Sequence, residues 1–305
     1  MTSQRENNAH RGGHRDQTDS AAGSVRAVRG RRRVAATLGT AALAAGLGTG
    51  WAGTALAAAP VPTAGANAPA VTKELNTKVA PGGNFNLSLW ELQLPTGSAG
   101  DPTTIPPSQL EGSNGFQDSY FYTNTSDGGM SFWDPENGVT TPNSSYSRSE
   151  LREMTSGGAA ANWFAAGTTN TLSATLDATQ VPDHVCVGQI HLGSGGSTKP
   201  LLELFYYANG NIVMAIEQTP AGGNEKTYTV GNVKLGTKWS YSIGLANSTI
   251  SLSVNSGKAQ TWTASSTFNG YGMYFKAGDY DQSTGSSSSV GAKVEFYALN
   301  IKHGS

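Results

Sequence analysis

Hydrophobic and polar residues alternate with a period of two in many short segments between about residue 84 and the C-terminus. Clusters of Gly, Asn, Ser and Thr separate these segments, and β-branched and aromatic residues are frequent inside them. The pattern predicts β-strands, because successive side chains of a strand point to opposite faces of a sheet. The clearest segments are residues 87–94, 171–176, 201–207, 212–218, 238–245, 249–254, 272–277 and 293–301.

Turn residues between these segments support the same fold class. Gly210-Asn211 follows the segment that ends at Tyr207, and Asn255-Ser256-Gly257 follows the one that ends at Val254. Both sequences are typical of tight turns. Helical turns are predicted only at residues 108–111 and 159–164. We therefore predict one all-β domain over residues 84–305, a concanavalin-like β-jelly roll of two sheets with a concave face.

The first 57 residues follow a different pattern. A polar, basic stretch ends at Arg31-Arg32-Arg33, and an apolar run rich in Ala, Leu and Gly extends from Val34 to Leu56. Ala55-Leu56-Ala57 resembles the small-residue cleavage site that ends an export signal. These features predict a signal peptide over residues 1–57, of general secretory or twin-arginine type, and a secreted protein. An Ala-, Pro- and Thr-rich flexible leader is predicted over residues 58–83.

Removal of the signal peptide changes the charge of the chain. Of the 20 basic and 21 acidic residues, 8 and 3 lie in residues 1–57, which leaves 12 and 18 and a net charge near −6. Such an acidic protein is not expected to bind nucleic acid or anionic membranes. The remaining chain contains only two arginines, Arg148 and Arg152, in one short segment. Guanidinium groups concentrated in this way indicate recognition of a carboxylate or phosphate.

The single cysteine, Cys186, excludes an intramolecular disulfide. It lies in the apolar run Val185-Cys186-Val187, where a buried and unreactive thiol is expected. Stability must then come from an ordinary hydrophobic core.

In three of the segments, strand parity places the polar side chains on one face of the strand. Side chains two apart share a face, so Arg148, Glu150 and Arg152 point together, as do Gln189 and His191 in a second segment. Tyr274, Lys276 and Tyr280 do the same in a third. The interior of a sandwich would not accept these groups, so they are expected on the open, concave face.

These segments resemble a known family. Arg-Ser-Glu-Leu-Arg at 148–152, Gln-Ile-His at 189–191 and Tyr-Phe-Lys-Ala-Gly-Asp-Tyr-Asp-Gln at 274–282 are similar to three signature segments of the alginate lyases of polysaccharide lyase family 7. Residues 87–95 and 294–303 resemble the opening and closing strands of that family. The resemblance implies a jelly roll that cleaves alginate, an anionic polysaccharide, by β-elimination without a metal or other cofactor.

The resemblance also implies roles for the site residues. Arg148 and Gln189 would bind the carboxylate next to C5, whose extra negative charge in the transition state must be stabilised. His191 would take the C5 proton and Tyr280 would protonate the leaving O4. Arg152 and Lys276 would hold neighbouring uronates, and Glu150 would orient the arginines. The predicted substrate-binding residues are Glu150, Arg152, Tyr274, Lys276 and Gln282.

Two details concern specificity and charge. Isoleucine at position 190 resembles family members that accept guluronate-containing blocks, so a guluronate preference is expected, with mannuronate preference as the alternative. Asp279 and Asp281 flank Tyr280 and are expected on the opposite face, because acidic groups in the cleft would resist a polyanion. His184 and His303 have no predicted role in the site.

Two other classes of function require residues that the chain also contains. A non-catalytic carbohydrate-binding module would use Trp90, Trp133, Trp163, Trp239 and Trp262 as stacking surfaces. A glycoside hydrolase needs two carboxyl groups about 5 to 9.5 Å apart, but Glu150 and Glu153 have opposite parity. An alginate lyase that acts as a monomer is the favoured prediction.

Overall fold

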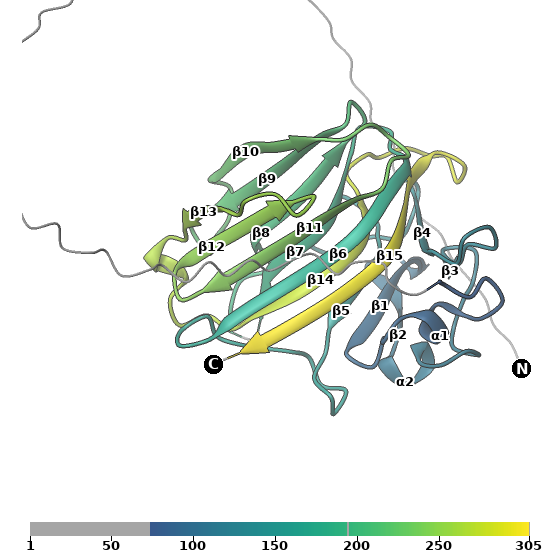
Figure 1. Ribbon diagram of the computed structural model, residues 1–305, viewed down its shortest axis with the longest axis horizontal. Helices are drawn as coiled ribbons and strands as arrows, with labels where there is room; N and C mark the ends of the chain where they lie inside the picture. Colours follow the sequence, from purple (N-terminus) through teal and green to yellow (C-terminus); the bar gives the residue numbers. More distant parts are fainter. Residues whose placement is uncertain (1–73, 194, 305) are drawn as a thin grey trace, which may run out of the picture. The chain divides into compact units, whose positions relative to one another are not determined.

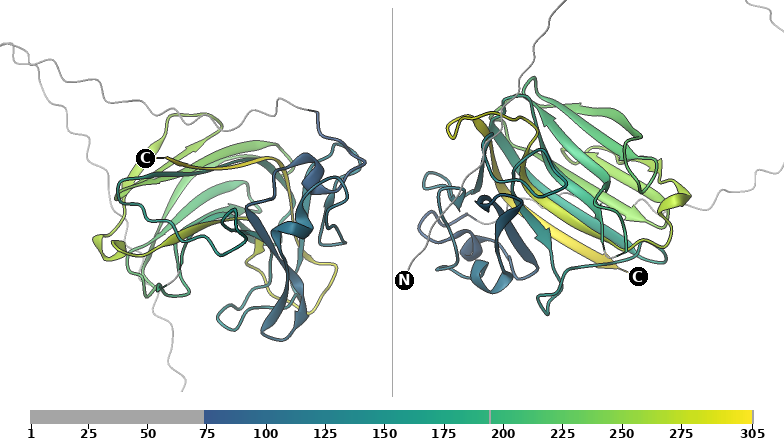
Figure 2. Two further views of the ribbon diagram at one scale, coloured as in Figure 1. Left: turned by 90° about the horizontal axis from the view of Figure 1, so that it is seen from below. Right: turned by 180° about the vertical axis from the view of Figure 1, so that it is seen from behind.

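The structure is a computed structural model that describes residues 74–193 and 195–304. In this part of the chain the regular structure is almost entirely β, arranged as two antiparallel sheets that lie face to face as curved layers (Figures 1 and 2). The predicted all-β two-sheet sandwich is thereby confirmed. The predicted signal peptide, and the leader as far as residue 73, lie outside the described residues. Among those described, no helix is long and apolar enough to cross a membrane.

The first sheet has eight strands and carries the polar segments identified from the sequence. Three of its neighbouring strands, β7, β14 and β5, contain these segments. In order across the sheet, the strands are β10 (Glu225–Asn232), β9 (Asn211–Glu217), β8 (Pro200–Tyr207), β7 (His184–Leu192), β14 (Met273–Asp281), β5 (Ser149–Glu153), β1 (Trp90–Ser98) and β2 (Asp101–Ile105).

The second sheet has seven strands and covers one face of the first. In order they are β13 (Gln260–Thr263), β12 (Thr249–Val254), β11 (Trp239–Ala246), β6 (Thr169–Gln180), β15 (Gly291–Gly304), β4 (Met130–Pro135) and β3 (Phe121–Thr123). The described helical elements are short: α1 (Pro81–Asn84), α2 (Pro107–Leu110) and a 3₁₀ turn at Ser266–Phe268.

Each of the eight predicted strand segments overlaps an observed strand, and the differences lie at the ends. Residues 249–254 match β12 in full, whereas residues 171–176 are only the middle of β6. The turn predicted at 108–111 corresponds to α2. The helical turn predicted at 159–164 is wrong, because Ala160 and Trp163 form isolated β-bridges there.

The core lies between the two sheets and is made of the alternate residues that the sequence pattern places inward. Ile190 and Ala277 of the first sheet and Phe296 of the second have no exposed surface. Phe296 meets Phe132 edge to face, with ring centroids 5.5 Å apart. The neighbours of Ile190 and Ala277 in sequence therefore point to the other face of the first sheet.

Two hairpins have the backbone that their sequences predicted. Gly210 has φ = 86°, and Asn255 and Ser256 have φ = 51° and 58°. In the second turn, positive φ at both central residues, Asn255 and Ser256, is the geometry of the type I′ turn, which matches the twist of paired strands.

The structure differs from the predicted leader at its C-terminal end. Leu75 packs against the core, and Ala80 is buried with its N–H bonded to the carbonyl of Ser113 at 2.9 Å. The folded part of the chain thus begins before the predicted boundary at residue 84. The Ala- and Pro-rich composition of residues 58–83 concealed this short packed segment.

Candidate functional site

A cleft of about 690 Å³ lies over the face of the eight-stranded sheet that points away from the core. We call this face the cleft face. All the predicted site residues except Glu150 line the cleft: Arg148, Arg152, Gln189, His191, Tyr274, Lys276, Tyr280 and Gln282. Three segments far apart in sequence thus contribute to one site.

Strand register explains how these side chains meet. Lys276 on β14 lies opposite Arg152 on β5 and opposite Gln189 on β7. Tyr274, two residues before Lys276, lies opposite His191. Because residues two apart share a face, one central strand brings the cations of β5 next to the amide and imidazole of β7.

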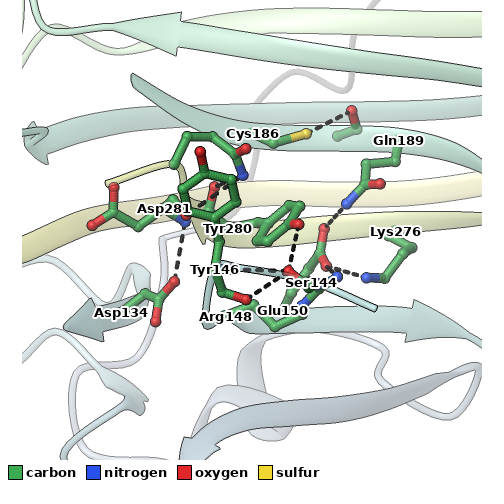
Figure 3. A network of polar contacts seen from close by, with 12 residues as sticks. Asp134, Ser144, Tyr146, Arg148, Glu150, Cys186, Gln189, Lys276, Tyr280 and Asp281 are labelled. Atoms are coloured by element: carbon green, nitrogen blue, oxygen red, sulfur yellow. Dashed lines mark hydrogen bonds and ion pairs between the residues drawn. The ribbon is translucent and has the colours of Figure 1, made fainter. Parts of the chain in front are cut away.

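Glu150 occupies a different place from the one predicted. Its side chain has no exposed surface and does not line the cleft, so its assignment as a substrate-binding residue is corrected. One carboxylate oxygen accepts a hydrogen bond from Gln189 Nε2 at 2.6 Å, and the other accepts from Lys276 Nζ. Arg148 lies 3.5 Å away. Figure 3 shows this carboxylate between Gln189 and Lys276.

Arg148 is held on two sides. Its guanidinium carbon lies 3.8 Å from the centroid of the Tyr280 ring, and a terminal nitrogen contacts Glu150. Only 8% of the residue is exposed. Burial acts to lower the pKa of Arg148, but the negative charge of Glu150 opposes it and the pKa is raised overall. A fixed, partly desolvated cation of this kind can neutralise a bound carboxylate.

Arg152 packs against an aromatic ring and not against Glu150, the carboxylate predicted to orient it. Its guanidinium lies 4.3 Å from the centroid of the Tyr274 ring. Its Nε is buried without a hydrogen-bond partner among the described residues. No ion pair with Glu150 accompanies this stacking in the described structure, so Glu150 orients Arg148 but not Arg152. The Tyr274 ring is the support of Arg152.

His191 is presented as a neutral base. Its Nδ1 lies 2.9 Å from the carbonyl oxygen of Leu192, and since a carbonyl only accepts, Nδ1 carries the proton and Nε2 keeps a free lone pair. Tyr274 stacks on the ring at 5.1 Å. Burial, and then the charge of Lys276, lower the pKa of His191 to about 4. The imidazole is therefore unprotonated at neutral pH.

Tyr280 is presented as a neutral acid. Its hydroxyl is 2.9 Å from the hydroxyl of Ser144, and the ring of Tyr146 meets its ring edge to face at 6.3 Å. Burial raises the pKa of Tyr280 above its usual value, although Arg148 opposes the shift. The phenol therefore keeps its proton at neutral pH and can donate it.

Lys276 lies between Arg152 and Gln189 on the cleft face. Only 6% of the residue is exposed. Burial and then the charge of Arg148 lower the pKa of Lys276 to about 8, and Glu150 opposes the shift. At neutral pH the ammonium group is retained and adds to the positive potential of the cleft.

Gln282 and the two flanking aspartates occupy opposite faces. Gln282 lines the cleft, and its amide donates to the carbonyl of Tyr280 at 3.1 Å. Asp279 and Asp281 are buried and do not line the cleft, in agreement with the prediction. Burial, together with Asp134, raises the pKa of Asp279 well above its usual range. A protonated Asp279 would add no negative charge behind Tyr280.

The cysteine and the two remaining histidines have structural surroundings. Cys186 has no exposed surface, and burial raises the pKa of its thiol well above the usual value, as expected for an unreactive cysteine. His184 stacks on Tyr207 with centroids 4.6 Å apart. His303 bonds to Glu153 at 2.7 Å, on the core side of β5. None of the three lines the cleft.

Several cleft residues were missed from the sequence. Ser144 and Tyr146 continue the even-numbered parity of Arg148, and extending that parity through the preceding loop would have found them. Glu203 is the one charged residue of β8, in Leu-Leu-Glu-Leu-Phe, and its isolation among apolar neighbours was a usable signal. In the described structure, no group of three or more His, Cys, Asp or Glu side chains is arranged to hold a metal ion.

The surroundings of the tryptophans and glutamates bear on the other functions considered. None of the five tryptophans required by a stacking carbohydrate-binding module lines the cleft, and Trp90 and Trp239 are each only 2% exposed. Glu153 points to the core side, where it accepts from Trp163 Nε1 and Phe275 N, both at 2.8 Å. Glu150 and Glu153 therefore do not form a hydrolase pair across one cleft.

Comparison with known proteins gives a consistent result. The family model for alginate lyase matches residues 85–303. An alginate lyase of Klebsiella pneumoniae is 28% identical over 281 residues, which cover 74% of this chain and 92% of that protein. The crystal structure of an alginate lyase of Pseudomonas aeruginosa is similar with a TM-score of 0.65 and 36% identity, covering 71% of this chain and 99% of the other.

A third similar structure belongs to alginate lyase A1-II′, a member of polysaccharide lyase family 7. It is 33% identical, with a TM-score of 0.64, and the match covers 74% of this chain and 99% of that one. Variants of the same enzyme have been solved with the substrate GGMG and with the product GGG.

Proposed function

The chain belongs to the alginate lyases of polysaccharide lyase family 7, and on this basis we propose that it is an exported enzyme that cleaves guluronate-containing blocks of alginate by a His191 base and a Tyr280 acid. The assignment of His191 as base and Tyr280 as acid rests on the protonation states of these two side chains. His191 has a free Nε2 and a lowered pKa, while Tyr280 has a raised pKa, and both line one cleft.

Charge neutralisation is the first requirement of the reaction. Removal of the C5 proton places extra negative charge on the adjacent carboxylate. Arg148 supplies a guanidinium whose position is fixed by Glu150 and the Tyr280 ring. Gln189 uses one amide hydrogen on Glu150, which leaves the second for a substrate oxygen. Both groups are in place before substrate binds, so little reorganisation is needed in the transition state.

Proton transfer completes the elimination. Nε2 of His191 takes the C5 proton, the electron pair of that C–H bond forms the C4–C5 double bond, and the C4–O4 bond breaks. The phenol of Tyr280 gives its proton to the departing O4. A bound uronate carboxylate beside His191 raises the pKa of the imidazole from its low value in the free enzyme, since an opposite charge favours the protonated form.

The two separate carriers support guluronate as the preferred sugar. In guluronate the C5 proton and O4 leave from opposite faces, which requires a base and an acid on two sides of the ring. In mannuronate they leave from the same face, and one group would have to serve both roles. A tyrosine that acted as base would have to ionise, which its raised pKa disfavours.

Residue 190 does not line the cleft. Ile190 is fully buried in the core and points away from the cleft. Ile190→Val is therefore expected to lower the free energy of unfolding by about 0.5–1.5 kcal/mol, through the loss of one buried methyl group. The ratio of activities on polyguluronate and polymannuronate should stay the same. Chemical denaturation and rates on the two polymers check this, and an inverted ratio would overturn it.

The reaction is tested on the purified domain of residues 74–305. With alginate it should produce the ultraviolet absorbance of a conjugated 4,5-unsaturated uronate, and initial rates should be higher on polyguluronate than on polymannuronate. Higher rates on polymannuronate would refute the block preference and leave the lyase activity intact. New reducing ends without absorbance would instead indicate hydrolysis.

Export and oligomeric state complete the proposal. The basic stretch, apolar run and Ala55-Leu56-Ala57 support cleavage after residue 57 and release from the cell. N-terminal sequencing of protein from the culture medium should find a start near Ala58. We further propose a monomer, for which light scattering should give the mass of one mature chain.

A further inference from the structure

One cleft residue has no place in the elimination described above. Glu203 lies on β8 directly opposite Gln189 and lines the cleft. The register thus forms a row across four strands of one sheet: Arg152, Lys276, Gln189 and Glu203. The row begins with two cations, continues with a neutral amide and ends with a carboxyl group. A polyanion that crossed it would meet attraction on one side and repulsion on the other.

The surroundings of Glu203 leave its carboxyl group available to the cleft. It makes no hydrogen bond or ion pair with any residue that the structure describes, and its side chain is half-buried at the wall of the cleft. The residues next to it in β8, Leu202 and Leu204, are fully or almost fully buried in the core. A carboxyl group that lines the cleft and is not held by another residue can act directly on a bound polyanion.

Two further glutamates extend the acidic character beyond β8. Glu217 on β9 and Glu225 on β10 are cross-strand partners, and both line the same cleft. The backbone N–H groups of Gly223 and Asn224 donate to Glu217, at 2.7 and 3.2 Å. Glu217 is thus already satisfied, whereas Glu203 stands between this acidic edge and the proposed catalytic groups.

We propose that Glu203 is a specificity-determining residue that limits how many uronates the cleft holds on the β8 side. Its carboxylate repels the carboxylate of a sugar that would lie beyond Gln189, so tight binding is confined to the part of the cleft over β7, β14 and β5. This inference rests on the proposed function and deepens it. The cleft selects its substrate by repulsion on one side as well as by attraction on the other.

The charge of Glu203 depends on pH. Burial, followed by Glu225 and Glu150, raises the pKa of Glu203 to about 7, while Lys276 and Arg148 oppose the shift. The other titratable groups that line the cleft nearby are His191 on β7, Tyr280 on β14, Glu217 on β9 and Lys199, which directly precedes β8. A carboxyl group is neutral below its pKa and charged above it. The repulsion is therefore present above about pH 7 and absent at clearly lower pH.

The test compares the purified protein with its Glu203→Gln variant, which keeps the shape of the side chain and removes its charge. KM for a ladder of alginate oligomers is measured at pH 6 and pH 8.5 from the unsaturated-uronate absorbance. At pH 8.5 the variant should have a KM for the longer oligomers about five- to tenfold lower than the parent, the scale of one like-charge contact in a partly wet site. At pH 6 the two should be nearly equal, and kcat should not change.

Two further variants sharpen the comparison. Glu225→Gln removes an exposed charge at the acidic edge, cannot disturb the core, and should lower KM in the same direction by a smaller factor. Glu111→Gln, outside the cleft, changes the net charge equally and should have no effect. The thermal unfolding of each variant is measured alongside.

The outcomes separate the inference from the function on which it rests. A parent protein that forms no unsaturated product from alginate overturns the proposed function itself. A parent that is active, with the same KM in Glu203→Gln and the parent at pH 8.5 for every oligomer length, overturns the role of Glu203 alone. A lowered KM that is independent of pH also overturns it, because repulsion by a titrating carboxylate must follow its charge.

Discussion

Replacing Tyr280 by phenylalanine is expected to lower kcat on alginate by about 10²- to 10⁴-fold, the contribution typical of a positioned general acid or base. The substitution removes the hydroxyl that lies 2.9 Å from Ser144. It keeps the ring that packs under the Arg148 guanidinium at 3.8 Å. Binding should therefore change little. Rates are followed by the absorbance of unsaturated uronate, and the Kd of an alginate oligomer is measured by calorimetry.

A matched substitution outside the cleft controls for the loss of a tyrosine hydroxyl. Tyr228 packs against Trp262 with centroids 5.5 Å apart and does not line the cleft. Tyr228→Phe should retain the activity of the parent. Undiminished turnover by Tyr280→Phe would exclude Tyr280 as the proton donor. A large loss of oligomer binding with little loss of kcat would make it a binding residue instead.

The position of the site along the chain was predictable because strand parity survives folding. Even-numbered Tyr274, Lys276 and Tyr280 all reach the cleft, although the pairing of β14 with β7 shifts register between Ala277 and Tyr280. The shift does not affect the pairing of β14 with β5, where Lys276 still lies opposite Arg152. The parity of β14 therefore holds on the side that carries the arginines.

How deeply each side chain is buried within the site could not be predicted from the sequence. Parity places Arg148, Glu150 and Arg152 on one face but does not say which side chain lies beneath the others. The short glutamate is covered by the longer lysine and arginine, whose ends reach over it. Contacts from loops were equally hidden: the bond from Ser144 to Tyr280 joins residues 136 positions apart. Such contacts depend on how the chain closes over the sheet, which periodicity does not encode.

The acidic side of the cleft could be predicted from the sequence only in part. Glu203, Glu217 and Glu225 belong to three consecutive strands, and each is out of phase with the apolar, core-facing residues of its own strand, which predicts a common face. What parity does not give is the order β7, β8, β9 and β10, which sets these carboxyl groups beside Gln189. The net negative charge of residues 58–305 suggested that cations are concentrated in the cleft. The structure adds that the cleft has an anionic side as well.

Replacing Glu150 by glutamine is expected to lower the free energy of unfolding by about 3–5 kcal/mol, the usual effect of removing one partner from a buried ion pair. Glu150 is fully buried against Arg148 and Lys276, which would be left as neighbouring cations without a counter-charge. Urea denaturation measures this loss. Activity should fall as well, because Gln189 and Arg148 lose the group that fixes their orientation.

The pH dependence of the Glu150→Gln enzyme distinguishes an electrostatic role from a merely structural one. Lys276 has a pKa of about 8 in the parent, and Glu150 is one of the groups that keep it from falling further. An amine is charged below its pKa, so the parent should lose this cation, and bind alginate less well, as pH rises through about 8. In Glu150→Gln the same rise in KM should begin at lower pH, and acidification should restore part of the affinity.

Glu153→Gln is the matched control. Glu153 is buried in the same strand and bonds to Trp163 and Phe275 on the core side. Its replacement should reduce stability without moving the pH at which KM rises. A parent-like pH profile in Glu150→Gln would show that Glu150 stabilises the sheet but does not maintain the charge of Lys276.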